Sequence, residues 1–242
     1  MLASLESFFV AVVLSGILML VGRLSLAKTL GRRRALSAAA GGSIAYIFIA
    51  LLPEIEATKE IYRQATHSFM PYKGLFGVNL AMMIGFLFFY ALAEMLPAES
   101  EETQSDPNNI AFWAQITGYG GYICLVGYLL VHSLSEVKES LFLYAISMSL
   151  HFLLVGFGLR DIHRERYDRI GRYVLAGFCL TGWFVGTLIE LPQPLVIILF
   201  GFVSGGVLSV TGIVELPKGK EGRFAYFLSG ACVYALFLIT FR

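Results

Sequence analysis

The chain has 242 residues, of which 57% are hydrophobic and only 14% are charged, and its formal net charge is +1. This composition is typical of an integral membrane protein and leaves almost nothing for a soluble domain. A net charge this small gives no indication of nucleic-acid binding, so we expect a lipid bilayer around the protein and no nucleic-acid partner.

Apolar stretches recur from one end of the sequence to the other. A membrane-crossing helix needs about 20 mostly apolar residues, so the sequence predicts an all-α membrane protein with eight crossings in one transmembrane domain. The first crossing is expected to be retained, because "MLASLESFF" before it has no Lys or Arg. The predicted crossings are residues 5–22, 35–53, 74–96, 110–132, 140–159, 172–191, 194–216 and 223–241.

The positions of Lys and Arg predict the orientation of the chain. Short cytoplasmic loops carry an excess of basic residues. With eight crossings, the four loops on one side carry 5, 0, 5 and 3 basic residues, and the other side carries 5 of the 18. We therefore predict that both termini lie on the non-cytoplasmic side.

Two stretches of the sequence match each other. "GGSIAYIFIALLPE" begins at Gly41 and Gly42, and "GGVLSVTGIVELPK" begins at Gly205 and Gly206, each with a Leu-Pro step eleven residues after its first glycine. The second and seventh crossings that hold them run in opposite directions. Small residues at helix contacts would explain either copy alone, and the Leu-Pro steps at residues 53 and 217 are expected to end both helices.

Shorter matches extend this repeat. "LSG" at residues 14–16 and "LTG" at residues 180–182 precede the two Gly-Gly pairs at similar distances, and "YAL" occurs at Tyr90 and Tyr234. The sequence thus predicts an inverted repeat of crossings 1–3 (residues 1–97) and 6–8 (residues 172–242), with a central pair within residues 110–159. Inverted repeats are common in transporters.

With this 3+2+3 topology and these two glycine-containing helices, the chain resembles the Zrt/Irt-like (ZIP) divalent-metal transporters. The resemblance implies transport of a metal such as zinc or iron, a homodimer, and a metal site formed by the fourth and fifth crossings. His151 in "SMSLHFLLVGFG" stands where the fifth-crossing motif of the family begins. The sequence departs from that motif, with Phe152 in place of a Glu and Val155 in place of the second His.

The central crossings each carry a polar stripe. Tyr144, Ser147 and His151 are three and four residues apart in the fifth crossing, so they share one helix face. The fourth crossing has a similar stripe, formed by Gln115, Tyr119 and Tyr122. Polar groups inside a membrane usually face the bundle interior, so the two stripes are expected to face each other. His151 is then an interhelical hydrogen-bonding residue, a substrate or proton contact, or a metal ligand.

Other candidates lie at the water boundary. His132 and Glu136 are four residues apart after the fourth crossing, and Glu54 lies on the same side. They could gather cations at an outer mouth, or they could be ordinary solvated residues. The charged segment "RDIHRERYDRIGR", which contains His163, is interpreted as a membrane-surface anchor.

Three classes of function remain open from the sequence. A transporter of divalent metals or another small solute is favoured by the repeat. An intramembrane hydrolase is not expected, because "SMSLH" has no further His at helical spacing. The alternative to transport is a protein that keeps the transporter fold but serves as a structural or regulatory subunit of a membrane complex. No cofactor is expected, because each Gly pair lies inside an apolar helix.

Overall fold

The computed structural model describes residues 2–21, 30–65, 71–94, 110–132, 141–212 and 223–241. These residues are almost entirely helical, and no strand occurs among them. The helices are α1 (Leu2–Val21), α2 (Leu30–Tyr46), α3 (Leu52–Ala65), α4 (Pro71–Glu94), α5 (Ile110–Val131), α6 (Leu141–Arg166), α7 (Arg172–Leu188), α8 (Gln193–Val210) and α9 (Arg223–Phe241). Two π-helical segments, η1 (Ile47–Leu51) and η3 (Tyr167–Gly171), join neighbouring helices. The prediction of an all-helical protein is confirmed.

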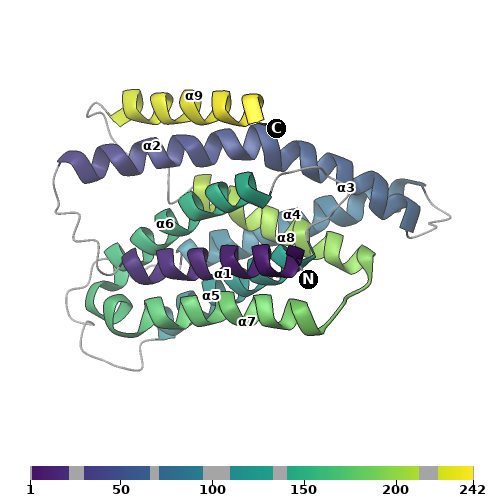
Figure 1. Cartoon of the computed structure of the whole chain (residues 1–242), viewed down its shortest axis with the longest axis horizontal. Helices are drawn as coiled ribbons and strands as arrows, with labels where there is room; N and C mark the ends of the chain where they lie inside the picture. The colour runs from purple at the N-terminus through teal and green to yellow at the C-terminus, as the bar shows by residue number, and fades with distance from the viewer. Residues whose placement is uncertain are drawn as a thin grey trace.

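Several of these helices suit a membrane environment. Six helices in the described part of the chain are long and apolar enough to cross a bilayer. One of them, Leu143–Leu188, has 46 residues and contains a kink at Arg164, whose φ is 42°. Figure 1 shows α6 and α7 as separate rods on either side of this kink. A further apolar helix, Leu5–Val21, is shorter.

The first Leu-Pro step does not end its helix, contrary to the prediction. Pro53 is the second residue of α3, and the helix continues to Ala65. The reason lies just before it, where η1 widens the helix and the amide of Leu52 donates to the carbonyl of Ile47, five residues earlier. A π-segment of this kind accommodates a local break in the regular hydrogen-bond ladder. The second step, at Pro217, lies outside the described residues.

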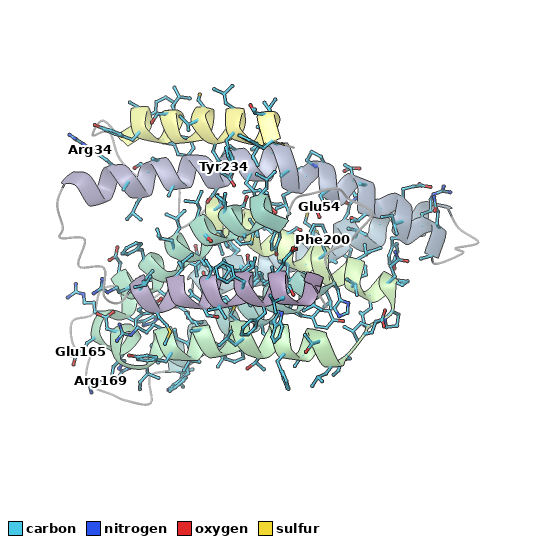
Figure 2. All side chains as sticks on the ribbon, viewed as in Figure 1. Arg34, Glu54, Glu165, Arg169, Phe200 and Tyr234 are labelled. Atoms are coloured by element: carbon cyan, nitrogen blue, oxygen red, sulfur yellow. The ribbon has the colours of Figure 1, made fainter. Side chains whose placement is uncertain are left out.

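The helices pack mainly in pairs. The most extensive contacts join α2 with α9, α4 with α8, and α5 with α7, and α1 packs against both α6 and α7. Figure 1 shows α9 lying along α2 at one edge of the bundle. Figure 2 places Arg34, Glu165 and Arg169 at one end of the bundle, which we call the basic end. The chain ends marked N and C in Figure 1 lie away from it.

Glycines let all three of these pairs approach closely, including α5 with α7, where a Cβ on Gly182 would overlap the carbonyl oxygen of Cys124. A Cβ on Gly41 of α2 would overlap the carbonyl oxygen of Phe227 in α9, and one on Gly205 of α8 would overlap the carbonyl oxygen of Met82 in α4. Because lipid provides no hydrophobic drive for association, such close packing is what holds membrane helices together. Both Gly-Gly pairs of the repeat therefore serve as helix-contact sites.

The same kind of contact is also made from the partner helices. A Cβ on Gly230 of α9 would overlap the carbonyl oxygen of Ala38 in α2, and one on Gly85 of α4 would overlap that of Phe202 in α8. The α2–α9 and α4–α8 pairs thus have backbone-to-backbone contact on both helices. These four glycines leave no room for a side chain.

The turn between α6 and α7 is held by charged side chains. Arg160 donates to both carboxylate oxygens of Asp168, at 2.8 and 3.0 Å. Arg164, between them, adopts a left-handed backbone conformation that is rare for a side chain of this kind. Tyr167 is fully buried, and its hydroxyl donates to the carbonyl of Leu18 in α1. The charged segment is therefore a fixed corner of the fold.

Candidate functional site

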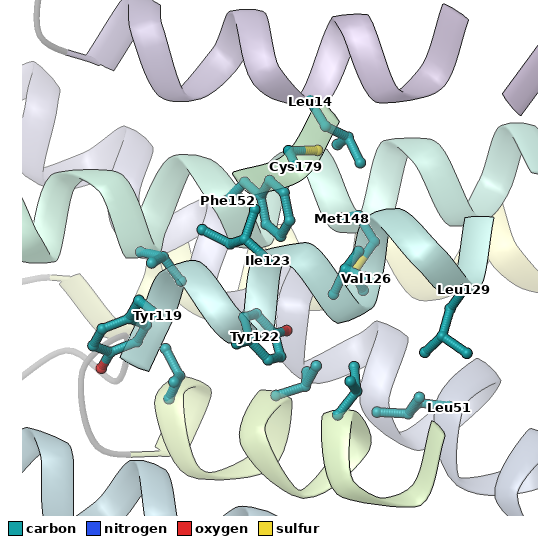
Figure 3. Close-up of a cluster of buried hydrophobic side chains, with 14 of the residues drawn as sticks. Leu14, Leu51, Tyr119, Tyr122, Ile123, Val126, Leu129, Met148, Phe152 and Cys179 are labelled. Carbon is teal, nitrogen blue, oxygen red and sulfur yellow. The ribbon is translucent and has the colours of Figure 1, made fainter. Parts of the chain in front are cut away.

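The interior of the bundle is filled mostly by apolar and aromatic side chains. Figure 3 shows part of this cluster around α5, from Tyr119 towards one end of the helix to Leu129 near the other. Hydroxyls, one amide and one imidazole are buried among them, at Gln115, Tyr122, Ser147 and His151. These polar groups are the candidate site.

The structure brings one member of each predicted stripe together. The rings of Tyr122 on α5 and His151 on α6 lie edge to face, with centroids 5.8 Å apart. Both side chains are only 1% exposed. His151 also lies near the ring of Phe152, at 6.4 Å. The predicted meeting of the two stripes is therefore found at this point.

The other members of the stripes have separate partners. Ser147 donates to the carbonyl of Leu143 at 2.8 Å and lies 2.7 Å from the hydroxyl of Tyr234 in α9, which can donate to it. Tyr119 packs its ring against Phe89 of α4, with centroids 5.6 Å apart. Tyr144 is partly buried. The two stripes diverge on either side of the Tyr122–His151 contact, each towards a different neighbouring helix.

Gln115 joins three helices near the basic end. Its amide nitrogen donates to the carbonyl of Leu92 in α4 at 3.0 Å, and its oxygen lies 2.7 Å from Nε2 of His163 in α6. The sequence did not predict this partnership, because the two residues are 48 positions apart. His163, interpreted as part of a surface anchor, instead reaches inward to a buried amide.

His163 belongs to the charged segment that follows the apolar part of α6. Burial, together with the nearby positive charge of Arg166, lowers the pKa of His163 to about 4. The ring of Phe112 packs edge to face against it at 5.0 Å. The imidazole is therefore neutral at pH 7, with its Nε2 proton donated to Gln115.

A cavity of about 30 Å³ lies beside Gln115. Its wall combines Gln115 and Tyr119 of α5 with small or apolar residues of α4, α6 and α8, among them Ala93, Gly158 and Val210. No ionisable acid, base or thiol contributes to it apart from the phenol of Tyr119. A space of this size holds about one or two water molecules. We call it the Gln115 cavity.

The predicted outer-mouth residues do not form a cluster in the described part of the chain. His132 donates from Nε2 to the carbonyl of Gly186 at 2.9 Å and stacks on Tyr128 at 4.6 Å. This contact ties the end of α5 to α7, so His132 has a structural role. Glu54 is buried on α3 with 8% exposure. Glu136 lies outside the described residues.

The described residues offer no ready metal site. No group of three or more His, Cys, Asp or Glu side chains could hold an ion among them. The cysteines Cys124, Cys179 and Cys232 are free and lie on different helices. A firm zinc site uses about three or four nitrogen, sulfur or carboxylate donors, whereas the ring contacts of His151 are with the aromatic side chains of Tyr122 and Phe152.

No known family model, curated protein or solved structure matches this chain.

Proposed function

We propose that this chain is a multi-pass membrane transporter for a small uncharged solute, with an architecture that resembles the ZIP family. In this proposal the chain crosses the membrane eight times and both termini lie on the non-cytoplasmic side. The helices α1, α2–α3 and α4 form one repeat, α7, α8 and α9 form the other, and α5 and α6 are the central pair. The apolar helices support membrane insertion.

The observation that carries the proposal is the matching of helix contacts between the two repeats. Gly41 meets Phe227 across the α2–α9 pair, and Gly205 meets Met82 across the α4–α8 pair. The α1–α6 contact likewise has its match in the α7–α5 contact. Exchange of the two repeats thus turns the α2–α9 contact into the α8–α4 contact and the α1–α6 contact into the α7–α5 contact. Transporters built from inverted repeats place their solute site between the halves, near the bilayer midplane.

The chemistry of the buried groups favours an uncharged solute. Tyr122, Ser147 and His151 offer hydrogen bonds but no formal negative charge. A buried cation without an anionic partner costs several kcal/mol. Zinc or iron, which the family resemblance implies, would lack ligands here. Divalent-metal transport therefore remains a prediction to be tested alongside neutral solutes.

Flux measurements on purified protein in liposomes test the proposal. In a hyperosmotic challenge, the rate of shrinkage reports water efflux, the rate of re-swelling reports the entry of formamide and urea, and an enclosed metal dye reports zinc, iron, manganese and cadmium. Faster flux than in protein-free vesicles is expected for neutral solutes and should fall in a His151→Phe or Tyr122→Leu variant. No flux of any solute would overturn the transport proposal.

A structural or regulatory subunit of a membrane complex is the second candidate. The exposed face of α9 favours it, because Val233, Leu236 and Ile239 are each 66–68% exposed, and α9 packs mainly on α2. Two results together would support this candidate instead. The protein would show no flux but be recovered from its native membrane in a defined larger complex, and substitution of Val233, Leu236 and Ile239 by Ser would abolish that complex.

A further inference from the structure

The matched contacts give a residue-by-residue correspondence between the two repeats. Gly41 corresponds to Gly205, a shift of 164 residues, and Met82 corresponds to Phe227, a shift of 145 residues. The reciprocal contacts obey the same shifts, since Ala38 and Gly230 become Phe202 and Gly85. The correspondence pairs Phe89, rather than Tyr90, with Tyr234. The sequence match at "YAL" is therefore one residue out of register, and Tyr90 is exposed.

The correspondence extends to the central helices α5 and α6. Tyr119 packs on Phe89, and Ser147 bonds to Tyr234, the residue that corresponds to Phe89. Tyr119 and Ser147 therefore match, with a shift of 28 residues. Gly206 lies against Tyr122, and Gly42 lies against Leu150, which gives the same shift of 28 independently. The central pair, left unpaired by sequence, follows the same exchange.

Three residues that line the Gln115 cavity have larger counterparts at the corresponding position of the other half. The shifts convert Ala93 to Leu238, Gly158 to Leu130, and Val210 to Tyr46. Each replacement is larger, and all three are at most 2% exposed. Gln115 itself corresponds to Leu143, which is also buried. Three other lining residues, Tyr119, Val155 and Leu159, have the smaller counterparts Ser147, Gly127 and Val131. The two positions therefore differ in shape, and an apolar side chain replaces the amide.

We propose that the Gln115 cavity is a one-sided binding site for an uncharged, hydrogen-bonding molecule of about the size of water, and that Tyr46, Leu130 and Leu238 close the corresponding site. Its lining lacks a formal charge, so a charged ligand would lose its hydration without compensation. The amide of Gln115 retains hydrogen-bonding capacity beyond its bonds to Leu92 and His163. The cavity lies towards the basic end, where Ile162 at its edge is 38% exposed.

This site is the solute's point of entry if the proposed transport is correct, but its existence does not depend on flux. The test compares Ala93→Cys with its matched control Leu238→Cys, each in a protein whose three native cysteines are replaced by Ser or Ala. The probes are the small neutral reagent methyl methanethiosulfonate and a cationic methanethiosulfonate as close to it in size as possible. Gel filtration selects folded protein, and mass spectrometry measures the rate of modification.

The neutral reagent is expected to modify Ala93→Cys at least tenfold faster than Leu238→Cys, and the cationic reagent is expected to lag behind the neutral one at Ala93→Cys. Equal rates at the two positions, or faster reaction at Leu238→Cys, would overturn the one-sided site. Preference for the cationic reagent would overturn the uncharged ligand. If the predicted rates are found while liposomes show no flux, the cavity is retained and only transport is rejected. Because Cys could distort position 93, Ala93→Ser provides a fold control by thermal stability.

Discussion

The α4–α8 and α2–α9 pairs are joined by the same backbone contacts, yet their surroundings differ. Beside the first pair, Ala93 and Val210 border a cavity. Beside the second, Leu238 and Tyr46 occupy the corresponding positions and are buried. Helix contacts in this fold are thus fixed by glycines, whereas the side chains beyond them differ between the halves. A binding site should therefore be sought where the side chains of the two halves differ.

The largest effect is expected from filling a glycine contact. Gly205→Leu would push α8 away from the carbonyl of Met82, and we expect a loss of about 3 kcal/mol or more, or no folded protein. Gly41→Leu should cost as much, because it disturbs the matching contact. Gly177→Leu is the control, since nothing lies within 4 Å of a Cβ there. Thermal unfolding in detergent measures the stability of all three variants. If leucine were tolerated at only one of the two contact glycines, the two helix pairs would not be equivalent.

A substitution at the cavity that makes the two halves alike should have an intermediate effect on the free energy of unfolding. Gln115→Leu gives α5 the residue type found at the corresponding Leu143. It also removes the hydrogen bonds to Leu92 and His163, so we expect a loss of about 2 kcal/mol. Gln115→Glu keeps the shape and serves as a comparison. Chemical unfolding measures the change, and an unchanged stability of Gln115→Leu would show that the bridge between α4, α5 and α6 contributes little.

The hydrogen bond on the opposite half should contribute about 1 kcal/mol. Ser147→Ala, Tyr234→Phe and the double variant form a double-mutant cycle for the 2.7 Å contact between α6 and α9. Residues in direct contact show such coupling, whereas distant ones add independently. Ser204→Ala, whose hydroxyl bonds only within α8, is a matched control and should show no coupling to Tyr234→Phe. Additivity of Ser147→Ala and Tyr234→Phe would refute the coupling.

Acid should also lower the stability, through His163. The pKa of His163 lies near 4 in the folded protein, below its ordinary value of 6.5. The unfolded chain therefore binds more protons in this range, and stability should fall as the pH drops from about 6.5 to about 4. His163→Asn should flatten this part of the pH profile while the remaining acid dependence persists. Melting temperatures across the range measure it, and identical slopes in wild type and variant would contradict the assignment.

Much of the fold could be predicted from the sequence, because its signals are local. Apolar runs predict the helices, and the Gly-Gly pairs at Gly41 and Gly205 predict close helix contacts. Helical spacing placed His151 and Tyr122 on faces that meet. The continuation past Pro53 could not be predicted, since it depends on the π-segment before it.

The partners of individual polar residues were mostly beyond prediction. Gln115 and His163 are brought together only by packing of α5 against α6, and the contact of His132 with Gly186 depends on where α5 ends relative to α7. The correspondence of α5 with α6 also escaped the sequence, because Tyr119 and Ser147 share a position but not a residue type. The correspondence of α5 with α6 is preserved in the contacts of these residues and not in their residue types.

The decisive measurement is solute flux in liposomes containing wild type, Ala93→Leu or Leu238→Ala. We expect wild type to pass water and formamide faster than empty vesicles do, Ala93→Leu to return to the empty-vesicle rate, and Leu238→Ala to keep at least the wild-type rate. Equal flux in wild type and Ala93→Leu, or none in wild type, would contradict this expectation.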